Sequence, residues 1–135
     1  KPISATVGKY APEIKEKLSK IISELNDAFG TDFNEDDRVF LGTIQDNLLK
    51  NKDLQNKLKH NSRENVKVIF NRYFDEEMTK LLKSNMKFYK RIVDNEKLSE
   101  KLKSALFDLV YYQYTKVKRE NKEEKGNTNK RIDDG

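Results

Sequence analysis

The sequence predicts an all-α protein, a bundle of about five helices, on the strength of three observations. Apolar residues recur at intervals of three and four as far as residue 118, which places them along one face of a helix. Lys, Glu, Leu and Asn dominate, whereas glycine (5) and proline (2) are scarce. Charged residues make up 38% and hydrophobic residues 35% of the chain, so we expect a small core beneath a highly charged surface.

Composition divides the chain into three parts. Residues 1–10 show no apolar period and form a lead-in segment, and residues 11–120 form the helical domain. Residues 121–135 contain one apolar residue, Ile132, and cannot bury enough surface to offset the entropy lost on ordering. We therefore expect a flexible, charged C-terminal tail. Because the chain begins with Lys1 rather than Met, we interpret it as a piece of a longer protein or a processed form.

The first predicted helix begins near Pro12 and ends before Gly30. Proline suits a first turn because its missing N–H would have no partner there. Glycine readily takes the left-handed conformation that stops a helix. The apolar stripe of this helix consists of Ile14, Leu18, Ile21, Ile22, Leu25 and Phe29.

Five carboxylates lie within residues 25–41, which raises the question of a metal site. An EF-hand loop needs ligands at alternating positions around a bending glycine. Here the glycine precedes the acids, and three acids are consecutive at 35–37. Asn34 can instead cap a helix, and the positive end of the helix dipole favours carboxylates in its first turn. We predict a helix start at this position, not a metal site.

Four more helices are predicted from the apolar stripes, over about 35–50, 53–60, 66–93 and 98–118. The stripe over 66–93 drifts near residues 74–78. One long helix and two helices joined by a bend both fit this pattern.

No motif for catalysis or cofactor binding is present, so we expect no catalytic, cofactor or metal residue in this chain. Phosphate-binding loops, dinucleotide fingerprints and hydrolase motifs are all missing. The chain has no cysteine, and its single histidine, His60, is predicted to end a helix. No apolar run approaches the roughly 18 residues of a membrane span. These features are typical of a cytoplasmic protein without a membrane partner.

Two groups of residues are candidate binding surfaces. The candidate interface comprises Tyr111, Tyr112, Tyr114, Lys116, Lys118 and Arg119. Successive helical residues lie about 100° apart, so Tyr111 and Tyr112 cannot both face one core; the alternative is that these tyrosines cover the edge of their own core. The candidate phosphate contacts are Lys87, Lys90 and Arg91, and the alternative for them is a solvated basic helix face.

Four stretches of the chain, the first containing "FGTDF" at 29–33 followed by the acidic helix start, carry a family resemblance. They cover residues 24–49, 61–82, 85–102 and 106–114. Their order and spacing resemble the C-terminal helical region of the motor (R) subunit of type I restriction–modification enzymes.

This resemblance implies a parent protein that is an ATP- and Mg-dependent DNA translocase and endonuclease. Its nuclease and motor domains would lie upstream in the same chain, and its helical region would associate with the methyltransferase (M) subunit. None of the family's catalytic motifs occurs here, so no catalytic residue carries over. We expect a non-catalytic assembly domain that docks the motor onto the methyltransferase core. The alternative is a helical module that contacts duplex DNA and guides it to the motor.

Overall fold

The computed structural model describes the backbone of residues 11–134 and the side chains of residues 12–118, so the lead-in segment 1–10 lies outside the described residues. The described part is helical and contains no strand, which confirms the predicted all-α class. Its elements are α2 (Ala11–Phe29), α3 (Glu35–Lys50), α4 (Lys52–His60), α5 (Arg63–Lys80), the 3-10 turn η1 (Leu82–Ser84), α6 (Met86–Val93) and α7 (Glu96–Asp134).

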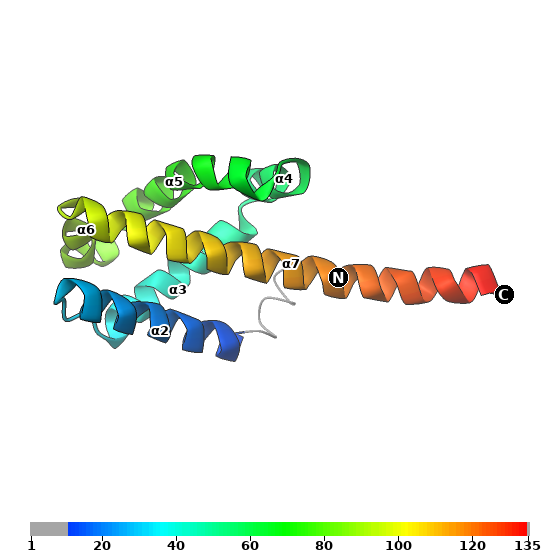
Figure 1. Cartoon of the computed structure of the whole chain (residues 1–135), viewed down its shortest axis with the longest axis horizontal. Coiled ribbons are helices and arrows are strands. Elements are labelled where there is room, and N and C mark those ends of the chain that lie inside the picture. Colours follow the sequence, from blue (N-terminus) through cyan, green and yellow to red (C-terminus); the bar gives the residue numbers. More distant parts are fainter. Residues whose placement is uncertain (1–10, 135) are drawn as a thin grey trace.

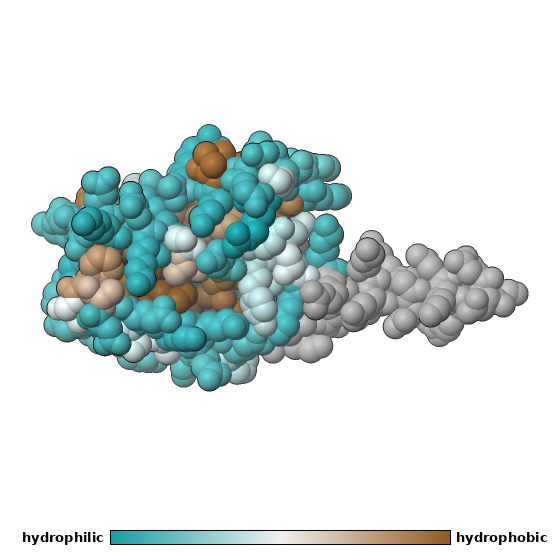
Figure 2. Space-filling view, in the orientation of Figure 1, coloured by the Kyte–Doolittle hydropathy of each residue, from teal (hydrophilic) through white to brown (hydrophobic). Residues whose placement is uncertain are grey.

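Helix α7 organises the bundle, because it contacts α2, α3, α5 and α6 (Figure 1). Helices α2 and α5 flank it on opposite sides in this view. The core between them is apolar, and its largest fully buried side chains include Phe70, Phe74, Phe88 and Phe107. Most of the face seen in Figure 2 is hydrophilic, and apolar residues show mainly in the seam between α2 and α7.

The corner between α2 and α3 has the local structure that the sequence predicts. Gly30 ends α2 with a φ of 64°, in the left-handed region that glycine tolerates. The side chain of Asn34 accepts the backbone N–H of Asp37, whose carboxylate in turn accepts the N–H of Asn34. This reciprocal pair is a capping box, which confirms that the acidic cluster starts a helix.

The segment predicted over 66–93 is two helices joined by a bend, not one long helix. Helix α5 ends at Lys80, the turn η1 follows, and α6 begins at Met86. The side chain of Asn85 accepts the N–H of Phe88, so a new N-cap restarts the helix after the break. The restart turns Phe88 into the core beside Phe33 and Phe40.

The helical backbone of α7 continues through residues 121–134, the segment predicted as a flexible tail. It extends past the other helices in Figure 1. Lys and Glu, which are frequent in this segment, have high helix propensity, which accounts for a helical conformation. The helix bounds do not test mobility, so flexibility of the tail stays a prediction.

Candidate functional site

The three tyrosines of the candidate interface lie in different directions around α7. All three are half-buried. Tyr112 contacts α2, Tyr111 lies beside the start of α5, and Tyr114 lines a groove next to α4. They therefore do not form one continuous aromatic patch, and two of them cover the protein's own helix contacts.

Tyr112 belongs to a polar cluster that joins α7 to α2. Its hydroxyl donates to Oε1 of Glu13. The ammonium of Lys116 donates to Oε2 of the same carboxylate at 2.9 Å, and Lys17 lies 4.7 Å from the centre of the Tyr112 ring. These contacts use two residues of the candidate interface, Tyr112 and Lys116, to hold α2 against α7.

The same contacts shift the titration of both charged groups. The Tyr112 hydroxyl and the Lys116 ammonium, which donate to the carboxylate, hold the pKa of Glu13 below its ordinary value of 4.5. The neighbouring Tyr112 and Glu13 raise the pKa of Lys116. The cluster is therefore charged throughout the neutral range.

Glu13→Gln is expected to reduce the acid sensitivity of the fold. Because the folded-state pKa of Glu13 lies below 4.5, its contribution to stability is present above about pH 4.5 and is lost as pH falls through the folded-state pKa. The free energy of unfolding, measured with urea, should fall more between about pH 6 and pH 3 in the parent than in the variant. The control is Glu24→Gln, an exposed residue of α2, and identical pH profiles for parent and Glu13→Gln would contradict the prediction.

Tyr111 packs on the N-terminal end of α5. Its ring centre lies 5.9 Å from that of Phe107, and the guanidinium carbon of Arg63 lies 5.5 Å from the Tyr111 ring. Arg63 also pairs with Asp108 on α7. Tyr111 thus helps to attach α5 to α7, as the alternative interpretation of the tyrosines expects.

Tyr114 and Lys118 lie at a groove of about 380 Å³ between α4 and α7, here called the α4–α7 groove. It is lined by Leu49, Lys52, Gln55, Asn56, Lys59, Tyr114, Val117 and Lys118. Burial raises the pKa of Tyr114, and Lys118 lies 5.9 Å from the Tyr114 ring. The side chain of Arg119 lies outside the described residues. Tyr114 and Lys118 are therefore the described residues of the candidate interface that line a groove.

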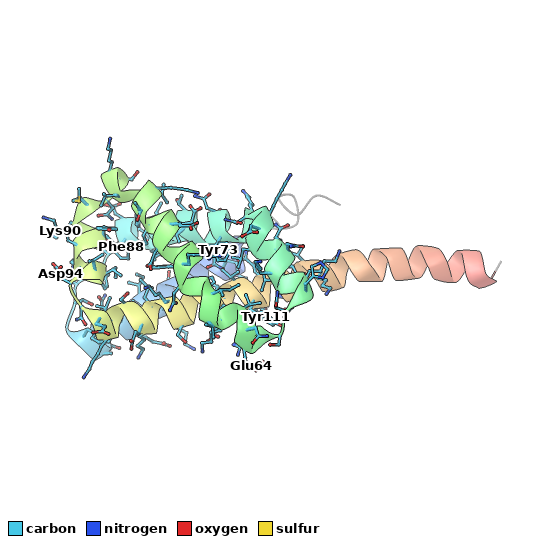
Figure 3. The ribbon with its side chains drawn as sticks, turned by 90° about the horizontal axis from the view of Figure 1, so that it is seen from above. Glu64, Tyr73, Phe88, Lys90, Asp94 and Tyr111 are labelled. Carbon is cyan, nitrogen blue, oxygen red and sulfur yellow. The ribbon has the colours of Figure 1, made fainter. Side chains whose placement is uncertain are left out.

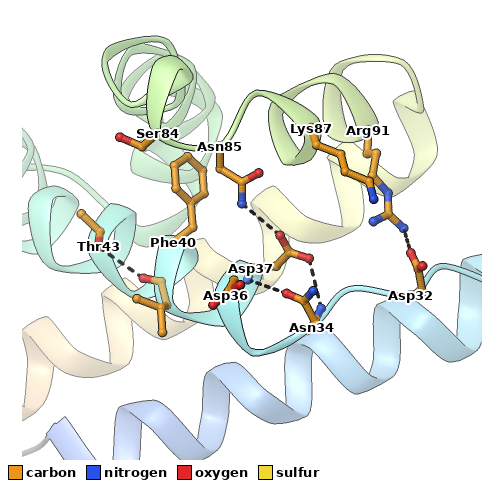
Figure 4. A pocket seen from close by; sticks show the side chains of 11 residues that line it. Asp32, Asn34, Asp36, Asp37, Phe40, Thr43, Ser84, Asn85, Lys87 and Arg91 are labelled. Atoms are coloured by element: carbon orange, nitrogen blue, oxygen red, sulfur yellow. Dashed lines mark hydrogen bonds and ion pairs between the residues drawn. The ribbon is translucent and has the colours of Figure 1, made fainter.

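The candidate phosphate contacts on α6 lie close to the acidic corner. Arg91 pairs with Asp32 at 2.7 Å, and its guanidinium carbon lies 4.2 Å above the ring of Phe33. Lys87 and Arg91 line a pocket of about 530 Å³ together with Asp36 and other corner residues (Figure 4). Lys90 is exposed and points away from the bundle (Figure 3). Carboxylates beside two of the three cations disfavour phosphate binding at this place.

The acidic corner itself links α3 to α6. Asp37 is 8% exposed, and it accepts a hydrogen bond of 3.0 Å from the side-chain amide of Asn85. Asn85 is also the N-cap of α6. The carboxylate of Asp37 therefore ties two helix starts together.

Sequence reasoning missed two polar features that the structure brings together. The first is the α4 side of the groove. The sequence pattern that could have revealed it is the set of lysine and amide residues on one face of the helix, at positions 52, 55, 56 and 59. The second is a buried amide pair, in which Gln45 donates to Gln113 at 2.9 Å between α3 and α7. Nothing in the sequence pairs two glutamines that lie 68 residues apart.

Comparisons of the chain with protein-family models, curated proteins and solved structures find no match. Within the described residues, no group of three or more acidic, histidine or cysteine side chains could hold a metal ion. None of the helices searched in that same part combines the length and the apolar character that crossing a membrane requires.

Proposed function

We propose that this chain is a non-catalytic helical docking module, which anchors the motor subunit of a type I restriction–modification enzyme to its methyltransferase core. The observation that carries the docking role is the α4–α7 groove, which includes Tyr114 and Lys118 of the predicted interface and combines apolar residues with a lysine rim. The resemblance supports the choice of partner. ATP and Mg²⁺ would be used by the upstream domains of the parent chain.

Two further groups with a shifted pKa, Glu35 and Tyr73, are engaged in contacts within the protein's own fold. The pKa of Glu35 is lowered, mainly because its carboxylate accepts hydrogen bonds from Arg38 on the same helix. The pKa of Tyr73 is raised by burial and by its hydrogen bond with Asp53, which joins α4 to α5. The Glu35 shift therefore follows from a contact within α3, and the Tyr73 shift follows from burial and from a contact between α4 and α5.

Co-elution with the methyltransferase core tests the proposal. The chain is mixed with M subunit and recognition subunit at micromolar concentration and passed over a size-exclusion column. We expect it to elute with the core. Separate elution would contradict the proposal, as would undiminished recruitment of a parent motor subunit from which residues 11–134 are deleted.

The alternative DNA-guiding module has weaker support, because Arg91 is paired with Asp32 and Lys87 shares its pocket with carboxylates. A mobility-shift assay with duplex DNA at low salt separates the two functions. DNA binding that weakens by about 0.9 log units per log unit of salt for each contacted phosphate would favour the alternative over docking.

A further inference from the structure

The walls of the α4–α7 groove have the regular spacing of two helix faces. Lys52, Asn56 and Lys59 recur along one face of α4, and Tyr114, Val117 and Lys118 recur along α7. Lys52 and Lys59 are seven residues apart, which is about 10 Å along a helix. A rod-shaped ligand that lies along α4 could therefore contact both lysines at once.

Among the described residues, the side chains that line the groove carry only positive charge. Three lysines line it, and within residues 12–118, whose side chains the structure describes, none of the lining residues is a carboxylate. Within the described part of the chain, Lys52 and Lys59 form no ion pair. The pocket at the acidic corner differs in this respect, because Asp32, Asp36 and Asp37 line it beside its cations. A partner that complements the α4–α7 groove must therefore bring negative charge.

The floor of the groove is apolar. Of its apolar lining residues, the half-buried ring of Tyr114 is the accessible one, since Leu49 and Val117 are only 1% and 3% exposed. Nucleic acid backbones would gain nothing from this floor. A protein segment with an apolar side chain between two carboxylates would use both the floor and the rim.

We propose that the α4–α7 groove binds an acidic amphipathic helix of a protein partner. An apolar side chain of that helix would lie over Leu49, Tyr114 and Val117. Carboxylates one turn before and one turn after it would pair with Lys52 and Lys59, and Lys118 would add attraction from the opposite wall. This inference rests on the proposed docking function and specifies the chemistry of the docked element.

A synthetic peptide tests the inference on the full chain. The probe is a fluorescein-labelled, alanine-based helical peptide with one leucine and a glutamate one turn on either side of it. A matched peptide carries lysines in place of the glutamates. Fluorescence anisotropy at low salt should show binding of the glutamate peptide and at least about tenfold weaker binding of the lysine peptide.

Charge reversal locates the binding site. The double variant Lys52→Glu/Lys59→Glu should weaken binding of the glutamate peptide at least about tenfold. The matched control is Lys67→Glu/Lys101→Glu, which changes the net charge equally at two exposed lysines outside the groove. This control should bind within about twofold of the parent. Circular dichroism of both variants checks that the helices remain folded.

Three results would overturn the inference: no binding of the glutamate peptide, equal loss in both double variants, or displacement of the peptide by short duplex DNA. Its failure can be told apart from failure of the docking function. If the parent and Lys52→Glu/Lys59→Glu both co-elute fully with the methyltransferase core, docking holds and the groove is not its site. If the peptide binds the groove but the parent does not co-elute with the methyltransferase core, the groove still binds acidic helices, and the proposed methyltransferase partner is wrong.

Discussion

Phe88→Ala is expected to lower the free energy of unfolding by about 3–5 kcal/mol, the cost of truncating a buried phenylalanine. Phe88 is 1% exposed, and its ring centre lies 5.2 Å from that of Phe33 and 5.4 Å from that of Phe40. The cavity would open between α6 and the corner at the start of α3, two segments that are far apart in the sequence. Urea unfolding followed by circular dichroism measures the change.

The matched control for Phe88→Ala is Val68→Ala on α5. Val68 is 77% exposed, so its truncation should change the free energy of unfolding by less than about 0.5 kcal/mol. A loss below about 1 kcal/mol for Phe88→Ala would contradict the placement of α6 against the corner. Such a result would also weaken the assignment of Arg91 to Asp32, because that ion pair depends on the same placement.

Gln45→Leu and Gln113→Leu are each expected to cost about 1–3 kcal/mol, whereas the double variant should be as stable as the parent or more stable. Both glutamines are almost completely buried, at 0% and 1% exposed. They share one hydrogen bond. Within the described residues, Oε1 of Gln45 and Nε2 of Gln113 have no hydrogen-bond partner.

The asymmetry arises because each single substitution leaves one buried amide without its partner. Replacement of both amides by apolar side chains of similar size removes that cost. A double-mutant cycle from urea unfolding curves measures the coupling between the two positions. Additive losses, with the double variant the least stable, would show that the pair is not coupled across the α3–α7 contact.

Helix starts and stops were predictable because they depend on neighbours in the sequence. Gly30 takes the left-handed conformation and Asn34 caps α3, and both signals act over a few residues. The sequence alone does not decide whether α5 and α6 are separate helices, since a drifting apolar stripe fits either geometry. In the structure, Asn85 starts α6 by accepting the backbone N–H of Phe88. Its side-chain amide also donates to Asp37, which lies 48 residues away.

The candidate site was predictable only in part. The sequence indicated that consecutive tyrosines of the last helix could not all be buried, and each is indeed half-buried. It did not indicate that Tyr112 and Lys116 bind Glu13. Nor did it indicate that Lys52 and Lys59 stand opposite Tyr114. These pairings depend on how helices distant in sequence are placed.

By itself, the sequence determined that this chain is helical and where its helices begin, because apolar period, caps and glycine stops are local properties of the backbone. Only the tertiary structure decided which charged residues form ion pairs with other helices and loops, and which line an open surface. Arg91 on α6 is paired with Asp32, while Lys52 and Lys59 line a groove whose described residues include no carboxylate. The physical reason is that electrostatic attraction depends on distance in space, and the packing of apolar stripes against α7 sets those distances.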